Sequence, residues 1–409
     1  MIHTLRRLHW DIMNSVPRPD PTRAAALERL AAFVPHAGAD YARLRNLDLP
    51  GHTHVSTLSP YIRVRLITEA EVIAAVTDVH GFGLAEKFLS EVSWRAYWKG
   101  WLQMRPVIWR DHQNGVRAGL NRLATESDLG RTWEAACLGA TGIDAFDHWA
   151  VELVQTGYLH NHARMWFASI WIFTLRLPWE LGADFFLRHL LDGDPASNTL
   201  SWRWVAGLHT PGKTYLATAE NIARNTKGRF SPKGLATQTH PIRGTKNPEP
   251  GPCPQGGTWD RRLPTALLLH EDDLSPDWLL DAGLRPVSTA LTLAPEGRTP
   301  LAAAPAIGVF ITGAMQDCIS RLGPALGGVH GPVQGTGAVD ALAAWARQTH
   351  AAQIVTPFAP VGPVSDLLDE LDARLAAENI RLVRAMRGYD AQAWPHATHG
   401  FFRLREAIR

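Results

Sequence analysis

Residues 158–204 constrain this chain more than any other part of its sequence. They read YLHNHARMWFASIW and, after five residues, LPWELGADFFLRHLLDGDPASNTLSWRW, and they include five tryptophans. Asn161, Arg164 and Met165 are three and four residues apart, so on a helix they share one face. A buried arginine needs an anionic partner, and the aspartates of the following DGDP turn are candidates. This polar face among tryptophans predicts the floor of a pocket for a large aromatic ligand.

The bulk composition excludes little. The 409 residues are enough for two or three domains. The net charge of +2 neither requires nor excludes a polyanionic partner. Cys137, Cys253 and Cys318 lie far apart, so their spacing indicates no disulfide framework and no metal site. We find no signal-peptide pattern at the N-terminus, and the most apolar stretch, residues 165–175, is too short to span a membrane. We therefore expect a cytoplasmic protein.

A helical pattern dominates the first part of the chain. Residues 22–34, 68–80 and 85–102 carry apolar side chains at three- and four-residue spacing. The composition changes at residues 231–262, which contain six prolines and several glycines. We therefore expect a helical domain over residues 1–230, followed by a linker or surface strap over residues 231–262.

Strand and helix signals alternate after the linker. We expect buried strands at residues 265–271, 306–313, 352–358 and 380–386. Amphipathic helices are expected at residues 339–350 and 364–379. Such alternation predicts a parallel sheet with crossover helices, a Rossmann-like α/β domain over residues 263–409. The glycine-rich stretch at residues 327–337 is not a P-loop and is expected to be a mobile loop.

The central motif resembles the flavin-binding core of the DNA photolyase/cryptochrome family. The likeness extends upstream through EVSWRAYW (91–98), TGIDAFD (141–147) and VSTLSPYI (55–62), so it covers roughly residues 40–215. In that family the α/β domain usually comes first, whereas here the helical domain leads. LLLHEDDL, near residue 268, is similar to the family's opening strand, so we interpret the order as a circular permutation. An unrelated α/β domain fused to a flavin domain is the alternative.

The resemblance implies FAD as the cofactor. Its implied binding residues lie in several segments of the chain: Tyr41, Ser56, Thr57, Leu58, Ser59, Glu91, Asn161, Arg164, Asp192, Asp194 and Asn198. On residue type alone, the serines of VSTLSPYI fit helix capping, and the resemblance shifts the interpretation towards binding the FAD diphosphate. Val55 and Thr57 depart from the family's usual threonine and arginine. Asn198 resembles the residue that faces flavin N5.

The resemblance also implies catalytic and substrate residues. Catalytic roles fall on Glu91, Asn161, Trp179 and Trp202, and DNA contacts fall on Arg45, Trp94, Arg95, Met165 and Trp204. From the residues alone, the favoured interpretation of Glu91 and Trp94 is an amphipathic helix with a buried tryptophan, and the resemblance reverses this preference. In the family, Trp202 and Trp179 match the proximal and middle members of an electron-transfer chain. The distal member stays open among Trp109, Trp133, Trp149, Trp166 and Trp171.

The implied activity is repair of cyclobutane pyrimidine dimers in DNA, driven by blue light and reduced FAD. Asn161 with Met165 matches the dimer-repairing members, because relatives that repair (6-4) photoproducts carry histidines there. The alternative is a light sensor that binds FAD and signals through a protein partner. Damaged DNA is the expected partner in the first case and an unknown signalling protein in the second. An antenna chromophore cannot be assigned.

Overall fold

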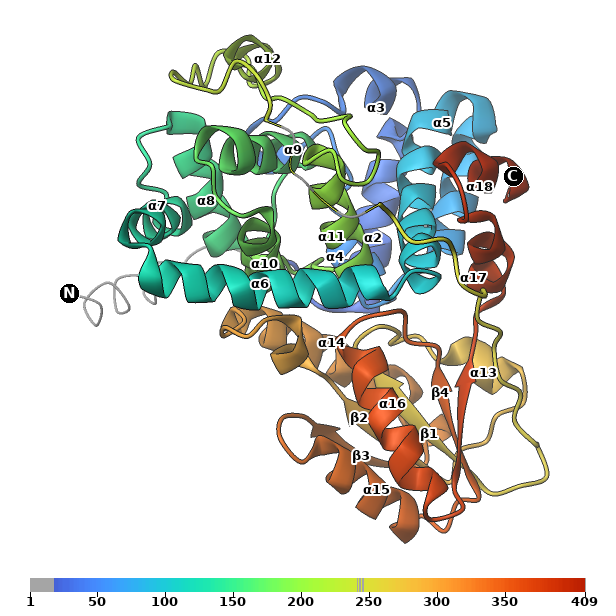
Figure 1. Cartoon of the computed structure of the whole chain (residues 1–409). Helices are drawn as coiled ribbons and strands as arrows, with labels where there is room; N and C mark the ends of the chain where they lie inside the picture. Colours follow the sequence, from blue (N-terminus) through green and yellow to red (C-terminus); the bar gives the residue numbers. More distant parts are fainter. Residues whose placement is uncertain (1–17, 241, 243, 245, 409) are drawn as a thin grey trace.

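The computed structural model describes residues 18–240, 242, 244 and 246–408, and it places a helical domain above a smaller α/β domain (Figure 1). The predicted fold class is confirmed, with the helices first and a parallel sheet last. The proposed limits of the domains stay a prediction. No helix in the described part of the chain is both long and apolar enough to cross a membrane.

The helical domain is a bundle around a tryptophan-rich core. Its α-helices are α2 (Arg23–Phe33), α3 (Ala39–Leu44), α4 (Ser59–Arg63), α5 (Glu69–Gln103), α6 (Val107–Thr125), α7 (Ser127–Leu138), α8 (Asp144–Thr156), α9 (Asn161–Ser169), α10 (Trp179–His189), α11 (Pro195–Val205) and α12 (Ala219–Asn225). A π-helical turn, Ile170–Thr174, continues α9. Trp149, Trp166, Trp171 and Trp202 are buried in the core, as expected for a residue type that packs before it does anything else.

Helix α5 is the longest element and joins two helices that the sequence predicts separately. It begins at a capping box in which Thr68 accepts from the backbone N–H of Glu71 and the Glu71 carboxylate accepts from the backbone N–H of Thr68. Gly81 then adopts a non-helical conformation with φ of 66°, which a residue without a β-carbon accommodates at little cost. The second half of α5 therefore runs at its own angle and presents residues 91–98 to the interior.

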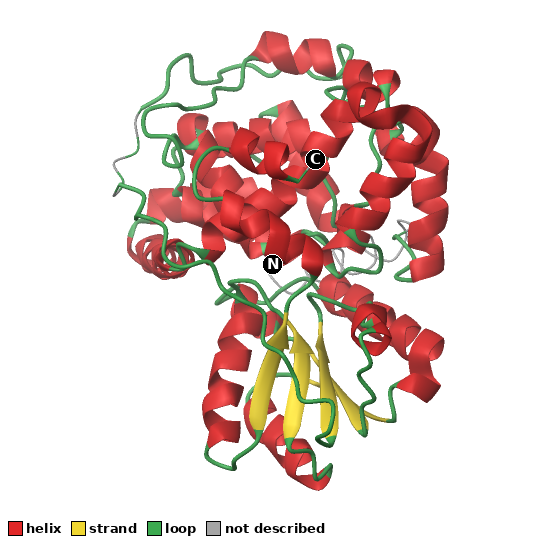
Figure 2. Cartoon of the chain, turned by 90° about the vertical axis from the view of Figure 1, so that its right-hand side faces the viewer, coloured by secondary structure: helices red, strands yellow, loops and turns green. Residues whose placement is uncertain are grey.

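The α/β domain contains one five-stranded parallel sheet in the order β3-β2-β1-β4-β5. Its strands are β1 (Thr265–His270), β2 (Ser288–Thr292), β3 (Gly328–Val333), β4 (Gln353–Pro357) and β5 (Arg381–Ala385). The helices beside it are α13 (Asp277–Asp281), α14 (Pro305–Leu322), α15 (Ala338–Gln348) and α16 (Pro363–Ala376). Figure 2 shows the carboxyl ends of the strands pointing at the helical domain.

Two expectations for this domain were wrong. The strand predicted at 306–313 is the first half of α14, because Pro305 starts a helix there and the buried Ala306, Ile307, Phe310 and Ile311 follow a helical period. The glycine-rich stretch predicted to be a mobile loop instead forms β3, a strand at the edge of the sheet. An edge strand needs pairing on one side only, so it tolerates glycine and proline that a central strand would not.

The segment after α12 crosses the helical domain without forming a helix or strand in its described residues. Asn247 accepts from Arg203 and donates to the carbonyl of His209, and Gly251 donates to the carbonyl of Met104. After β5 the chain returns to α5 through α17 (Gly388–Ala393), a turn at Trp394–His396 and α18 (Phe401–Ala407). Figure 1 shows α17 and α18 lying beside α5.

Candidate functional site

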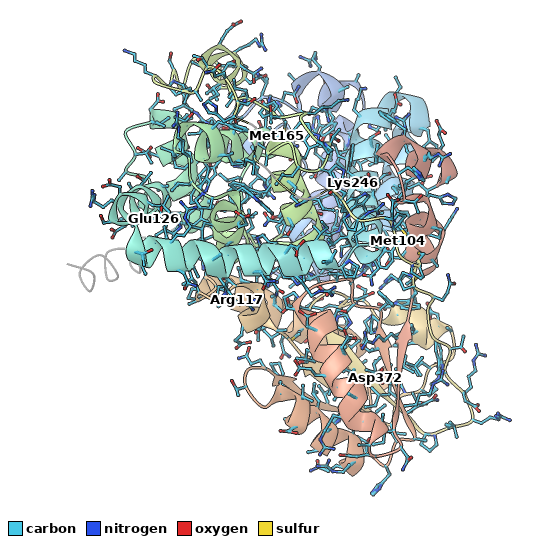
Figure 3. All side chains as sticks on the ribbon, viewed as in Figure 1. Met104, Arg117, Glu126, Met165, Lys246 and Asp372 are labelled. Carbon is cyan, nitrogen blue, oxygen red and sulfur yellow. The ribbon has the colours of Figure 1, made fainter. Side chains whose placement is uncertain are left out.

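A cavity of about 630 Å³ lies inside the helical domain, within the range of roughly 300–1,000 Å³ that small-molecule pockets span. Its walls come from α3, the loop before α4, the second half of α5, α9 and α11. Met165 of α9, labelled in Figure 3, is one of the lining residues. Every residue that the sequence singled out for cofactor, substrate or catalysis lines this cavity except Trp179. Segments far apart in sequence thus meet around one space.

The ion pair expected on α9 is present. Arg164 Nη2 donates to Asp192 Oδ2 at 2.8 Å, and Arg164 Nε donates to the carbonyl of Leu159. Burial opposes the positive charge, but the Asp192 carboxylate outweighs it and raises the pKa of Arg164 above its usual value. Asp192 Oδ1 has no partner among the described residues. The cavity therefore contains a permanent, oriented cation.

Asp194 belongs to a different charge cluster. Its carboxylate accepts from the Ser197 N–H and so caps α11. It also lies 3.2 Å from Lys99 Nζ and 3.8 Å from Arg95 Nη2. Burial would raise the pKa of Asp194, but Lys99, Arg95 and Arg63 hold it well below the usual range. Asp194 therefore fixes the start of α11 and balances buried cations.

Asn198 follows on the first turn of α11, and its side chain is oriented by the backbone. Its Nδ2 donates to the carbonyl of Ala183 at 2.8 Å. This bond uses one of the two amide hydrogens, so Asn198, which lines the cavity, keeps its side-chain oxygen as an acceptor and a second N–H as a donor. The site thus offers a neutral hydrogen-bond acceptor at this wall.

The serine loop before α4 lines the cavity without capping that helix. The N-cap position is Leu58, which has no side-chain capping bond. Ser56 Oγ accepts only weakly from the Leu58 N–H, at 3.4 Å. Thr57 adopts a left-handed backbone conformation with φ of 51°, which costs a non-glycine residue about 1 kcal/mol. The simple helix-capping interpretation of these serines is therefore not what the structure has.

Two of the expected DNA-contacting arginines are engaged inside the protein. Arg45 forms an ion pair with Glu91 at the cavity wall. Arg95 pairs with Glu69 at 3.1 Å, and its side chain is only 13% exposed. A guanidinium held this way is poorly placed to contact a phosphate. A DNA phosphate at Arg95 would have to compete with Glu69, and this contact stays a prediction.

Trp94 is covered by the C-terminal part of the chain. Its ring stacks on Phe401 of α18, with centroids 4.0 Å apart and planes at 7°. Trp98 lies on α5 next to it, at 5.1 Å. Trp204 is different, because it is 37% exposed and has only Tyr215 stacked beside it, at 5.8 Å. Both predicted substrate walls line the cavity, and Trp204 is the more exposed of the two.

The ring contacts of Trp202 differ from those expected. Trp202 lies 6.2 Å from Trp171 in an edge-to-face arrangement. Gly182 lies against both rings, and a β-carbon there would overlap Trp202. Trp179 instead lies 5.6 Å from His112, whose ring stacks on Trp109 at 5.3 Å. The tryptophan next to the cavity-lining Trp202 is thus Trp171.

His112 predicts a measurable pH dependence. Burial, aided by the charge of Arg203, lowers its pKa from 6.5 to about 4. In the unfolded chain His112 is protonated below pH 6.5, whereas in the folded protein it is protonated only below about pH 4. Stability contributed by this group is therefore complete above pH 6.5 and lost as the pH falls towards 4, by up to about 1.4 kcal/mol per pH unit.

We expect His112→Phe to keep the stack and to flatten this dependence. The measurement is urea unfolding at pH 6.5 and 4.5 for wild type and variant. A variant with the same loss of stability as wild type over that interval would show that His112 does not titrate as inferred.

The comparisons with known proteins agree with this geometry. Residues 88–234 match the family described as the FAD binding domain of DNA photolyase. The deoxyribodipyrimidine photo-lyase of Vibrio cholerae is 29% identical over 227 residues, which cover 53% of this chain and 47% of the relative. That of Streptomyces griseus is 35% identical over 164 residues, or 40% of this chain and 34% of the relative. Over residues 88–234, the helical domain is therefore of the DNA photolyase FAD-binding type.

The chain spans about half or less of the length of these relatives. Among solved structures, a bacterial class III photolyase from Agrobacterium tumefaciens is 27% identical with a TM-score of 0.42, over 51% of this chain and 42% of the other. The cofactor of the chain is FAD, as in the family that matches. The cavity fits that cofactor, because it combines sufficient volume, the oriented Arg164 cation and the unpartnered Asp192 oxygen.

Some residues of this photolyase/cryptochrome-type site escaped the sequence analysis. Lys99 is buried and forms the closest ion pair of Asp194. Its position four residues after Arg95 and eight after Glu91 places it on the same face of α5, so the spacing alone could have indicated it. Phe401 carried no such signal, because its contact with Trp94 joins α18 to α5, two segments far apart in the sequence.

Proposed function

We propose that the protein repairs cyclobutane pyrimidine dimers in DNA, using FAD and blue light. The observation that carries the proposal is the half-exposed Trp204 at a cavity that also contains Asn161 and Met165. Reduced FAD, when bound and excited, would supply an electron to the dimer and recover it after the cyclobutane ring has opened. The substrate must be turned out of the duplex to reach an interior cavity.

The residues around the cavity would divide the remaining tasks. Trp204 would stack on the dimer, a contact worth about 1–3 kcal/mol per base in comparable sites. Asn161 and Glu91 would donate or accept hydrogen bonds at the dimer, and Met165 would supply a polarizable apolar surface. Arg164 would stabilise negative charge on the cofactor. Because Arg45 pairs with Glu91, a DNA phosphate would have to compete with that carboxylate.

The test is light-dependent repair of an oligonucleotide with one thymine dimer, followed as recovery of thymine absorbance against a dark control. Trp204→Ala is expected to weaken binding of this oligonucleotide by about tenfold or more while FAD stays bound. Tyr215→Phe, which keeps the ring beside Trp204, serves as the control. Unchanged affinity in Trp204→Ala would remove the stacking role.

A light sensor is the second candidate, and the covered Trp94 favours it. With one face of Trp94 on Phe401 and Arg95 held by Glu69, two expected substrate contacts are engaged internally. An FAD-loaded protein that shows no repair over many light cycles would favour the sensor. We propose that the order of the two domains is a circular permutation and that the protein acts in the cytoplasm.

Electron supply to the cavity gives a further prediction. The contact between Trp202 and Trp171 makes Trp171 the expected next carrier, whereas the resemblance points to Trp179. We expect Trp171→Phe to slow photoreduction of FAD as strongly as Trp202→Phe does, with Trp179→Phe close to wild type. The measurement is the loss of oxidised-flavin absorbance under blue light with an external reductant. The opposite ranking of the two variants would restore Trp179 to the chain.

A further inference from the structure

The carboxyl end of strand β1 carries a cluster of buried acids. Glu271, Asp272 and Asp273 follow directly after the last residue of β1, and all three are buried. β1 has β2 on one side and β4 on the other, so the order in which the strands are added changes direction at β1. In open parallel sheets this is the crevice in which ligands bind. In this protein the acids there pair with arginines, from the helical domain (Arg63 and Arg65) and from the later part of the chain (Arg298 and Arg387).

Arg63 connects this cluster of acids to the wall of the cavity. It is the last residue of α4, and it is buried with a side chain 2% exposed. One guanidinium nitrogen donates to Asp272, and another lies 3.7 Å from Glu271. Its Nε donates at 2.9 Å to the carbonyl of Gly193. A single side chain thus joins the end of the sheet to the turn between Asp192 and Asp194.

That turn forms part of the cavity wall. Asp192, Gly193 and Asp194 all line the cavity. Asp192 holds Arg164 from one end of the turn, and Asp194 caps α11 from the other. The position of the Gly193 carbonyl therefore affects both the cation of the site and the helix that carries Asn198.

The α/β domain touches the same turn at a second point. Gly362, just before α16, lies so close to Pro195 that a β-carbon at Gly362 would be 2.8 Å from Pro195 Cγ. Pro195 is the first residue of α11. Pro195, at this end of the turn, is therefore packed directly against the sheet domain.

We propose that the carboxyl end of the sheet is a positioning element of the FAD cavity, acting through Asp272 and Arg63 on the Gly193 turn. The proposal rests on the assignment of the cavity to FAD. It gives the α/β domain a direct function in holding the cofactor, at the crevice where other sheets of this kind take a ligand. Asp272 and Arg63 are positioning residues, because the cavity is lined by the turn they hold and by neither of them.

The test separates this role from simple stabilisation of the interface. Asp272→Asn keeps the shape of the side chain and removes its charge, so we expect FAD to bind about tenfold more weakly. Arg63→Met combined with Asp272→Leu removes both charges, a change that often restores stability to a buried pair. It leaves the Gly193 carbonyl without its donor, so FAD affinity should stay about tenfold weaker although the unfolding temperature of the apoprotein recovers.

The control is Asp369→Asn, which breaks the 2.7 Å pair with Arg384 in the same domain, where the Asp369 side chain is 66% exposed. Arg63→Lys provides a milder version should the double variant not fold, since it keeps the charge but lacks Nε. The readouts are the FAD dissociation constant and the visible circular dichroism of bound FAD. FAD affinity that recovers together with stability, or that is unchanged in Asp272→Asn and Arg63→Lys, would overturn the proposal. A wild-type chain that binds no FAD would overturn the cavity assignment itself.

Discussion

Asp192→Ala is expected to lower the free energy of unfolding by about 3 kcal/mol and to abolish tight FAD binding. The substitution leaves Arg164 without its carboxylate, although the arginine side chain is only 24% exposed. An uncompensated charge in that position must either stay poorly solvated or move towards water. Movement would take the guanidinium out of the cavity and remove the group that we expect to stabilise anionic FAD. Urea unfolding and the flavin absorbance of the purified protein measure both effects.

Glu220→Ala is the matched control for this experiment. Glu220 also pairs with an arginine, Arg224, but at 3.9 Å and with a side chain 89% exposed. A pair in that setting contributes less than about 0.5 kcal/mol, and it lies outside the cavity lining. If Asp192→Ala changed stability no more than Glu220→Ala does, the Arg164–Asp192 pair would not be the anchor that its geometry indicates.

Gly182→Ala is the second substitution with a large expected effect. Gly182 lies in α10, where alanine would normally stabilise the helix by up to about 1 kcal/mol. Here the new β-carbon would overlap the ring of Trp202 and come within 2.9 Å of Trp171 Nε1. Both tryptophans are buried, so neither ring can move aside freely. We expect a net loss of about 1–3 kcal/mol and slower photoreduction, because Trp202 must shift at the cavity wall.

Gly308→Ala controls for the helical propensity of alanine. Gly308 lies inside α14, and no atom would approach its added β-carbon within 4 Å. This variant should gain up to about 1 kcal/mol in unfolding experiments. Equal gains in the two variants would mean that the space between Trp171 and Trp202 is larger than the structure shows.

The fold could be predicted from sequence wherever a segment carried its own periodic signal. Helix α2 and strands β1, β4 and β5 were predicted within a residue or two. The prediction of a strand within α14 was wrong, because a run of Ile, Val and Phe fits the periodicity of a strand as well as that of a helix. The prediction for β3 was wrong, because its pairing with β2, rather than its own composition, makes this segment a strand.

The candidate site was predictable to the extent that its motif resembled a known one. The pairing of Arg164 with Asp192 follows from that motif, and so does the presence of both Tyr41 and Asn198 in the lining of the cavity. The pairing of Arg95 with Glu69 does not, since it depends on how the two halves of α5 lie against each other across the kink at Gly81. Trp171 was only one of several candidates, because the distance between two rings is not encoded in their spacing along the chain.

The packing of α18 against α5 has a consequence for biosynthesis. Tyr97 donates to the carbonyl of His399, a contact between residues 302 positions apart, and Phe401 covers Trp94. At a synthesis rate of about 5–20 residues per second, the nascent chain would wait roughly 15–60 seconds for that cover. During this interval the aromatic face of α5 is exposed to solvent and to chaperones. The helical domain therefore completes its surface only after the whole sheet domain has been translated.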